Sequence, residues 1–364
     1  MTLKGHKNHY NVKLLRGYGI SVSLKDNQIH LKDGTDILTG KSETESWFIT
    51  QLPYEKIVIS GKGYVSTEAL KLLNQNYRNV ILTDTYGKPV SFMNGMMESL
   101  TATKYRMAQY DTFRDPAKCR YLARQTIRAK IESQINFLKS TENELVKDGI
   151  MKLESHLKQI DDESLDPVKI EAPSSHVYFR NYARLIPAKY GFESRNNSSI
   201  RITKRRASDV INALLNYGYA VLAGEISKYV NGFGLDAYCG FMHKMHTGFQ
   251  PLVYDLMEPF RWLVENTVYK LANSQTNGQT IRLKDYAFTK DSSVVLSDDL
   301  IRRFLELLER IFQRERKYEF KHGAKTPDGL KSVQEITVSK IMIENLIVFC
   351  VNKSNNLHIQ LVNE

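Results

Sequence analysis

The sequence has little cysteine. Among 364 residues, Cys119, Cys239 and Cys350 are the only ones that carry thiols. Their number is odd, they lie far apart, and none belongs to a CxxC pair. This distribution excludes both a disulfide framework and a zinc ribbon, which need even sets or close pairs of cysteines. We therefore expect unpaired, mostly buried thiols in a protein of a reducing compartment.

Long hydrophobic runs are also missing. No segment approaches the roughly 18 consecutive apolar residues of a membrane span, and residues 1–8 are polar rather than the start of an apolar leader. No GxSxG motif indicates a serine hydrolase. Gly61-Lys62-Gly63 lacks the spacing and the terminal Lys-Ser/Thr of a P-loop. We expect a cytoplasmic protein without a membrane partner.

Acidic residues are outnumbered by basic ones. Lysine and arginine total 51 against 40 aspartates and glutamates, which gives a net charge of +11 and a pI of about 9.3. Such an excess favours a polyanionic partner, most often nucleic acid, although many basic proteins bind none. Hydrophobic residues make up 42% of the chain, which is enough for the cores of about two domains at this length.

The pattern of the chain changes after its first quarter. Before that point, Gly19–Leu24 alternates apolar and polar residues, Lys25–Gln28 indicates a turn and 29–31 returns, which together predict a hairpin. The segments 56–60 and 79–84 are short β-branched runs, as in strands. After it, apolar residues recur at helical spacing. We therefore expect an α+β protein, with a β-rich domain at residues 1–96 and a larger all-α domain at 97–364.

Cap residues locate some of the expected helices. Ser66 or Thr67 can cap a short helix, and Asp115 followed by Pro116 is typical of the start of another. Further helices are expected near 174–186, 208–230, 251–272, 297–320 and 335–351.

One segment of the chain combines an imidazole with two carboxylates. His243 precedes Asp255 by twelve residues and Glu258 by fifteen. If 252–258 is helical, the two acids share one face. One nitrogen ligand with hard oxygen ligands suits a divalent cation such as Mg²⁺ or Mn²⁺. A solvated helix face is the alternative, but these acids lie among apolar residues, where an unpaired charge is costly.

Two further residues bear on that site. Glu171 stands just before an expected helix that starts at Pro173, so it could supply a third ligand or only complement the helix dipole. His246 forms an HxxH pair with His243, which could suggest zinc. Neither an HExxH motif nor a cysteine supports zinc, and a loop or surface position is the simpler interpretation of His246.

Basic residues gather in two segments that could line a track for phosphates. In the first, several members are spaced by four, so they share a helix face. The two sets are Arg114, Lys118, Arg120, Arg124, Arg128 and Lys130, and Arg201, Lys204, Arg205 and Arg206. Solvated faces are the alternative. The 20 tyrosines could also stack on unpaired bases, although most of them are expected in the core or on the surface.

Three parts of the sequence, taken in order, resemble a known family. They are 57–70 with 80–90, the apolar stretch Asn212–Leu222, and Gly240–His243 with Asp255–Arg261. Together they cover most of residues 17–270. They are similar to the CRISPR adaptation integrase, the first-numbered Cas protein, which is also described as a CRISPR-associated endonuclease.

The resemblance implies an N-terminal β-sandwich-like domain that forms a homodimer, followed by a helical catalytic domain. It implies Mg²⁺ or Mn²⁺ held by Glu171, His243 and Glu258, with Asp255 as a second acid near the metal. It implies a reaction on double-stranded DNA, in which the 3′-hydroxyl of a spacer precursor attacks a phosphodiester of the CRISPR repeat. With water as the nucleophile, the same site would nick DNA. A small ferredoxin-like adaptation subunit is the implied companion.

Two alternatives stay open. A transposon-encoded relative of the same fold would join the ends of a mobile element, but such relatives often carry an added helix-turn-helix, and the sequence after residue 330 has no convincing one. A catalytically silent DNA-binding scaffold is the other alternative. Phe249 and Pro173 depart from the usual family pattern, whereas His243 and both downstream acids are retained and favour activity.

Overall fold

The structure is a computed structural model. It describes residues 12–35, 42–84, 89–93, 102–195, 207–243, 250–275, 280–290, 292–319 and 330–352. Within these ranges, no helix is both long and apolar enough to cross a membrane.

The N-terminal part forms one mixed sheet of six strands. They are β1 (Val12–Lys25), β2 (Gln28–Lys32), β3 (Thr44–Phe48), β4 (Lys56–Val65), β5 (Asn79–Thr83) and β6 (Pro89–Met93), in the spatial order β3-β2-β1-β4-β5-β6. β4 pairs in parallel with β1 and β5, and the other pairs are antiparallel. The expected hairpin at the end of β1 is confirmed: Asp26 and Asn27 both have positive φ, as a tight two-residue turn requires.

Both faces of the central strands are buried. Val58 and Ile81 belong to the large core shared with the helices, whereas their neighbours Ile57 and Val80 belong to a second core beneath α1 (Thr67–Gln75). Side chains alternate along a strand, so one sheet can supply two cores. Helix α1 begins as expected, because Ser66 accepts a hydrogen bond from the backbone N–H of Ala69.

Two details of the expected fold need correction. The described N-terminal residues form a single hydrogen-bonded sheet rather than the two facing sheets of a sandwich. The C-terminal part is not all-α either, since it contains two small antiparallel pairs. These are β7 (Tyr286–Phe288) with β8 (Val294–Leu296), and β9 (Glu315–Glu319) with β10 (Leu330–Gln334). The boundary expected at 96–97 lies between β6 and the first C-terminal helix, outside the described residues.

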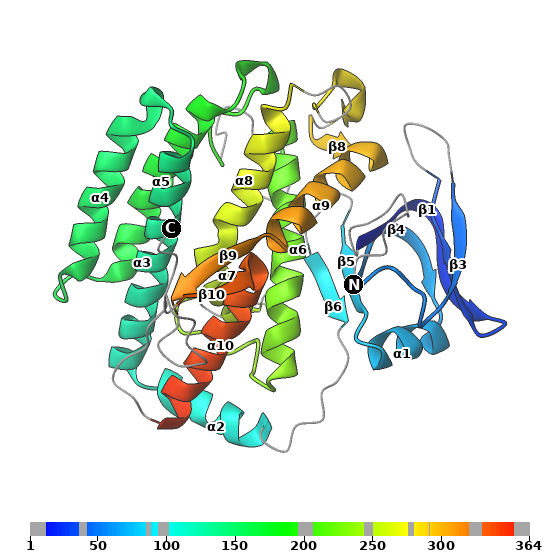
Figure 1. The fold of residues 1–364 in the computed structure, drawn as a ribbon, viewed down its shortest axis with the longest axis horizontal. Coiled ribbons are helices and arrows are strands. Elements are labelled where there is room, and N and C mark those ends of the chain that lie inside the picture. Colours follow the sequence, from blue (N-terminus) through cyan, green and yellow to red (C-terminus); the bar gives the residue numbers. More distant parts are fainter. Residues whose placement is uncertain are drawn as a thin grey trace.

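Helices make up most of the C-terminal part (Figure 1). They are α2 (Ala102–Phe113), α3 (Pro116–Ser140), α4 (Lys147–Asp161), α5 (Pro167–Leu185), α6 (Val210–Gly232), α7 (Pro251–Met257), α8 (Arg261–Ala272), α9 (Asp298–Phe312) and α10 (Glu335–Asn352). Short 3-10 turns are η1 (Glu144–Val146), η2 (Ala188–Tyr190), η3 (Glu258–Phe260) and η4 (Leu283–Asp285). Pro116 starts α3 behind the cap Asp115, as expected. The helix expected at 297–320 is too long, because α9 ends at Phe312 and β9 follows.

Helix α6 lies at the centre of the molecule, between the sheet and the other helices (Figure 1). It is apolar around most of its circumference, as expected for a helix enclosed on all sides. Its Gly224 allows the sheet to approach closely, since a Cβ there would lie 2.6 Å from Cδ1 of Ile81.

Ion pairs join the sheet to the helices at this junction. Lys56 of β4 is buried and lies 2.5 Å from Glu309 of α9 and 3.4 Å from Glu225 of α6. Arg302 of α9 contacts Asp33 at 2.6 Å, in the segment after β2. These contacts fix the sheet against α6 and α9, and they hold the N-terminal part in a defined position next to the helical part.

Candidate metal centre

Glu171 lies inside α5, one turn beyond its beginning. The helix starts at Pro167, and Asp166 caps it by accepting a hydrogen bond from the N–H of Val168 at 3.1 Å. The expectation that Glu171 precedes a helix starting at Pro173 is therefore wrong. The sequence offers two prolines that could begin a helix, and Asp166 before Pro167 is the better cap. Ser174 returns a hydrogen bond to the carbonyl of Ile170, 2.7 Å away, beside the internal proline.

His243 is held by Asp255, which is completely buried on α7. The imidazole Nδ1 lies 2.6 Å from Oδ1 of Asp255. The same carboxylate accepts the backbone N–H groups of Phe241, Met242 and His243 at 2.7–3.0 Å. Because an ionised carboxylate only accepts hydrogen bonds, the Nδ1 atom carries a proton. Nε2 is then the ring nitrogen whose lone pair can bind a metal.

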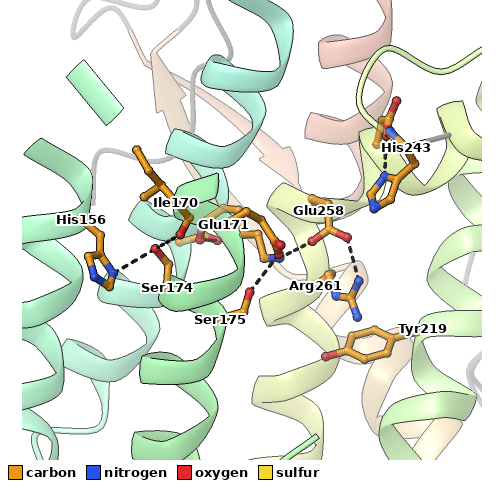
Figure 2. A network of polar contacts seen from close by, with 12 residues as sticks. His156, Ile170, Glu171, Ser174, Ser175, Tyr219, His243, Glu258 and Arg261 are labelled. Atoms are coloured by element: carbon orange, nitrogen blue, oxygen red, sulfur yellow. Dashed lines mark hydrogen bonds and ion pairs between the residues drawn. The ribbon is translucent and has the colours of Figure 1, made fainter. Parts of the chain in front are cut away.

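Glu258 follows α7 directly, in the 3-10 turn η3, and its side chain is buried between two cations. Arg261 donates to Oε1 at 2.8 Å, and Lys130 of α3 lies 2.7 Å from Oε2. Lys130 also donates to Glu171, whose Oε1 accepts a second hydrogen bond from Ser175 at 2.9 Å. Figure 2 shows Glu171, Glu258 and His243 gathered in one region, contributed by three separate parts of the chain.

The charges of this cluster act on one another. Burial raises the pKa of Glu258, but Arg261 and Lys130 outweigh burial and hold the pKa at about 2. Burial lowers the pKa of His243, whereas Asp255, and less strongly Glu258 and Glu171, raise it above the usual value. Burial also lowers the pKa of Lys130, and its two glutamates reverse the effect. Glu171 and Glu258 therefore both lie within electrostatic reach of His243.

Buried aromatic and acidic side chains hold Arg261 in place. The guanidinium stacks on Tyr219 of α6, with Cζ 4.2 Å from the ring centroid. The Tyr219 hydroxyl donates to Glu265 at 2.8 Å, and Tyr178 donates to the other oxygen of Glu265 at 2.6 Å. These partners are buried, so Arg261 has one defined orientation toward Glu258 (Figure 2).

The chemistry of the donors fits a divalent cation. One imidazole nitrogen and two carboxylates form a set that Mg²⁺ or Mn²⁺ accepts. Glu258 Oε2 is buried and makes no hydrogen bond of good geometry, although Lys130 is close to it. Among the described residues, no three His, Cys, Asp or Glu side chains are close enough to hold an ion as they stand. The ammonium of Lys130 fills the space between the two glutamates instead.

The four predicted site residues divide into two roles. Glu171, Glu258 and His243 form the candidate ligand set, and Asp255 lies behind His243 as its acceptor. Sequence reasoning missed the part played by Lys130 and Arg261 at this site. A usable signal existed for Lys130, because helical spacing from Ile127 places it on the apolar stripe of α3, where a charge needs a partner.

Several basic residues of the expected phosphate track contact other parts of the protein instead. Arg124 is buried and donates to four carbonyl groups, which belong to Ile160, Asp162, Glu163 and Leu165, where α4 ends and the chain turns toward α5. Arg128 pairs with Asp161 and Glu132, and Lys130 faces the metal centre. Residues 201–206 and His246 lie outside the described residues.

Comparison with known proteins identifies the family. The profile of the family "CRISPR associated protein Cas1" matches residues 14–310. A CRISPR-associated endonuclease Cas1 of Archaeoglobus fulgidus is 30% identical over 278 residues, which cover 71% of this chain and 78% of that protein.

Solved structures share the fold. A casposase bound to integration product matches with a TM-score of 0.80 and 24% identity, over 97% of this chain and 96% of the other. A chain of a Cas6-RT-Cas1–Cas2 complex matches with a TM-score of 0.71 and 18% identity, over 96% of this chain and 36% of the other. The fold, with its N-terminal sheet and helical C-terminal part, is the one found in these structures. The chain belongs to the CRISPR-associated protein Cas1 family.

Proposed function

We propose that this protein is a metal-dependent DNA integrase and endonuclease that inserts short foreign DNA segments into a CRISPR array. One observation carries the proposal. Glu171, His243 and Glu258 come from three separate segments, and they are brought to one place in a member of a family whose relatives are endonucleases. The net charge of +11 is consistent with a DNA substrate.

Glu171, His243 and Glu258 would hold the cation, through carboxylate oxygens and the Nε2 atom of the imidazole. A bound Mg²⁺ or Mn²⁺ would polarise the phosphodiester under attack and stabilise the charge that develops on the leaving 3′-oxygen. Asp255 keeps His243 in the tautomer that can bind metal, and it fixes the plane of the ring. Arg261 holds one oxygen of Glu258, so that the carboxylate keeps its orientation.

Other protein partners also belong to the proposal. Relatives occur in a Cas6-RT-Cas1–Cas2 complex, and the family implies both a homodimer and a small ferredoxin-like companion. We propose that this chain assembles in the same manner, with the N-terminal sheet as the dimer surface.

A strand-transfer assay tests the proposed function. A short DNA duplex with free 3′-hydroxyl ends is incubated with the protein, Mn²⁺ and a supercoiled plasmid that carries a CRISPR repeat array. We expect covalent joining at the repeat boundary by the wild-type protein and none by His243→Ala, with DNA binding retained. Binding without joining or nicking by the wild-type protein would support a silent scaffold instead.

A second function deserves its own arm of this assay, because the casposase match extends over nearly the whole chain. A transposon-type integrase would join the terminal sequences of a mobile element. Equal amounts of a spacer-precursor duplex and of a duplex with mobile-element ends should be offered in competition. Preferential insertion of the spacer precursor into the CRISPR repeat supports the first function, and preferential use of mobile-element ends supports the second.

A further inference from the structure

Lys130 stands where a cation would be needed. It projects from the buried face of α3, and its ammonium makes ion pairs with both acidic members of the candidate ligand set, Glu171 and Glu258. Each of those carboxylates comes from a different helix or turn. A single positive charge therefore bridges the two acids, as a divalent cation shared by them would do.

Lys130 and a metal ion cannot share this position. One oxygen of Glu258 is taken by Arg261, and the other lies 2.7 Å from the ammonium of Lys130. On Glu171, the ammonium and the hydroxyl of Ser175 both occupy Oε1. A cation that binds Oε1 of Glu171 and Oε2 of Glu258 would therefore take the position of the ammonium, and two like charges in a buried site repel strongly.

Arg261 compensates only Glu258, and the Ser175 hydroxyl brings no charge to Glu171. Glu258 and Lys130 are both almost completely buried, so water cannot replace a lost partner. Asp255, the third acid nearby, is already committed to His243 and to three backbone N–H groups. Lys130 thus keeps two buried or half-buried acids close together without a metal.

We propose that Lys130 is an internal counter-ion, which occupies the cation position when no metal is bound and is displaced when a divalent cation enters. This inference rests on the proposed function, because it takes Glu171, His243 and Glu258 as the ligands. It assigns to Lys130 a positioning role: the residue preserves the spacing of the ligands in the metal-free protein, and it weakens metal binding by direct competition.

Mn²⁺ affinity gives the test, with free Mn²⁺ measured by electron paramagnetic resonance in the absence of DNA. We expect Lys130→Met to bind Mn²⁺ about tenfold more tightly than the wild type. A change of this size is typical when one group alters the affinity of a site for another. Lys130→Arg, which retains the charge, should not tighten binding. The direction of the change in Mn²⁺ affinity is decisive, since damage to the ligand set would weaken Mn²⁺ binding rather than tighten it. Lys139→Met is the matched control, because Lys139 lies on the same helix and pairs with a single surface carboxylate, Glu154.

Thermal unfolding provides a second readout on the same variants. Without metal, Lys130→Met should unfold at a lower temperature than the wild type, and saturating Mn²⁺ should raise its midpoint by more than it raises that of the wild type. If this variant does not fold without metal, Lys130→Gln serves in its place, because its amide can still donate to Glu171.

A crystal structure of the wild-type protein with bound Mn²⁺ tests the inference without any substitution. We expect the ammonium to lie more than about 4 Å from the carboxylates of both Glu171 and Glu258, outside ion-pair distance. Unchanged or weaker Mn²⁺ affinity in the folded neutral variants would overturn the inference, as would an ammonium that stays between the glutamates beside the ion. Failure of the proposed function is distinguishable, because His243→Ala would then leave Mn²⁺ affinity unchanged.

Discussion

His243 and Asp255 are joined twice. The imidazole Nδ1 lies 2.6 Å from Oδ1 of Asp255, and the backbone N–H of His243 donates to the same oxygen at 3.0 Å. The carboxylate therefore fixes both the ring and the backbone that carries it. This double attachment explains how a short segment after α6 can present one nitrogen in a defined direction.

Asp255→Asn should impair DNA joining while leaving DNA binding intact. The amide has nearly the same shape, but it lacks the charge that keeps the proton on Nδ1. We expect the joining rate to fall about 10- to 100-fold, as for other acceptors behind metal-bound histidines. Asp209→Asn is the control, because Asp209 is also buried and accepts a backbone N–H, that of Asn212, at the start of α6. A rate within twofold of the wild type in Asp255→Asn would contradict the assigned role.

Arg124→Met should destabilise the protein without changing how DNA binding depends on salt. Loss of charged hydrogen bonds to the carbonyl groups at the end of α4 is expected to cost about 2–4 kcal/mol in urea unfolding. A residue that contacts a phosphate would instead lower the slope of log affinity against log salt by about 1. Arg120→Met, an exposed neighbour on the same helix, is the comparison. A reduced slope in Arg124→Met would show that Arg124 contacts a phosphate and belongs to the phosphate track.

Lys56→Met should reduce the free energy of unfolding by about 3–5 kcal/mol, because Glu309 would lose its buried cation and Glu225 one of its two. Lys139→Met removes an exposed ion pair and is expected to cost less than about 1 kcal/mol. Chemical unfolding followed by circular dichroism measures both values. A similar, small loss in both variants would show that the junction does not depend on Lys56.

The same junction predicts a loss of stability in acid. Burial raises the pKa of Glu225, but Lys56 and Lys228 lower it more, so its pKa lies below the usual value of 4.5. The folded state therefore binds a proton at this group less readily than the unfolded state. The resulting stabilisation is complete above the unfolded pKa, and it is lost as the pH falls through the lowered value.

Glu225→Gln isolates this contribution. The difference in unfolding free energy between wild type and Glu225→Gln should be largest near neutral pH and should shrink steadily below about pH 4.5. Urea melts at half-unit intervals from pH 3 to pH 7 would measure it. A difference that stays constant with pH would mean that the glutamate is not stabilised in its charged form.

The sequence predicted the elements that local patterns determine. Ser66 and Asp115 are caps whose side chains bond to nearby N–H groups, so α1 and α3 begin as expected. The hairpin at Asp26-Asn27 is equally local. The position of Glu171 shows the limit of such local signals. Pro167 and Pro173 could each begin a helix, and only the packed structure shows that α5 starts at Pro167.

Roles that depend on distant partners could not be predicted in this way. Arg124 and Arg128 share a spacing of four, which indicates a common face but not what that face contacts. Arg124 turned inward to the end of α4, some 36–41 residues away in the chain. Lys130 and Glu258 likewise meet only through the packing of α3 against η3. Their pairing has no signature in the sequence near either residue.

A crystal of the wild-type protein soaked in Mn²⁺ tests the central claim most directly. The account predicts one anomalous peak within about 2.0–2.3 Å of a carboxylate oxygen of Glu171, a carboxylate oxygen of Glu258 and the Nε2 atom of His243. A peak bound by none or only one of these three side chains would contradict the account, provided that protein from the same crystals joins DNA in solution.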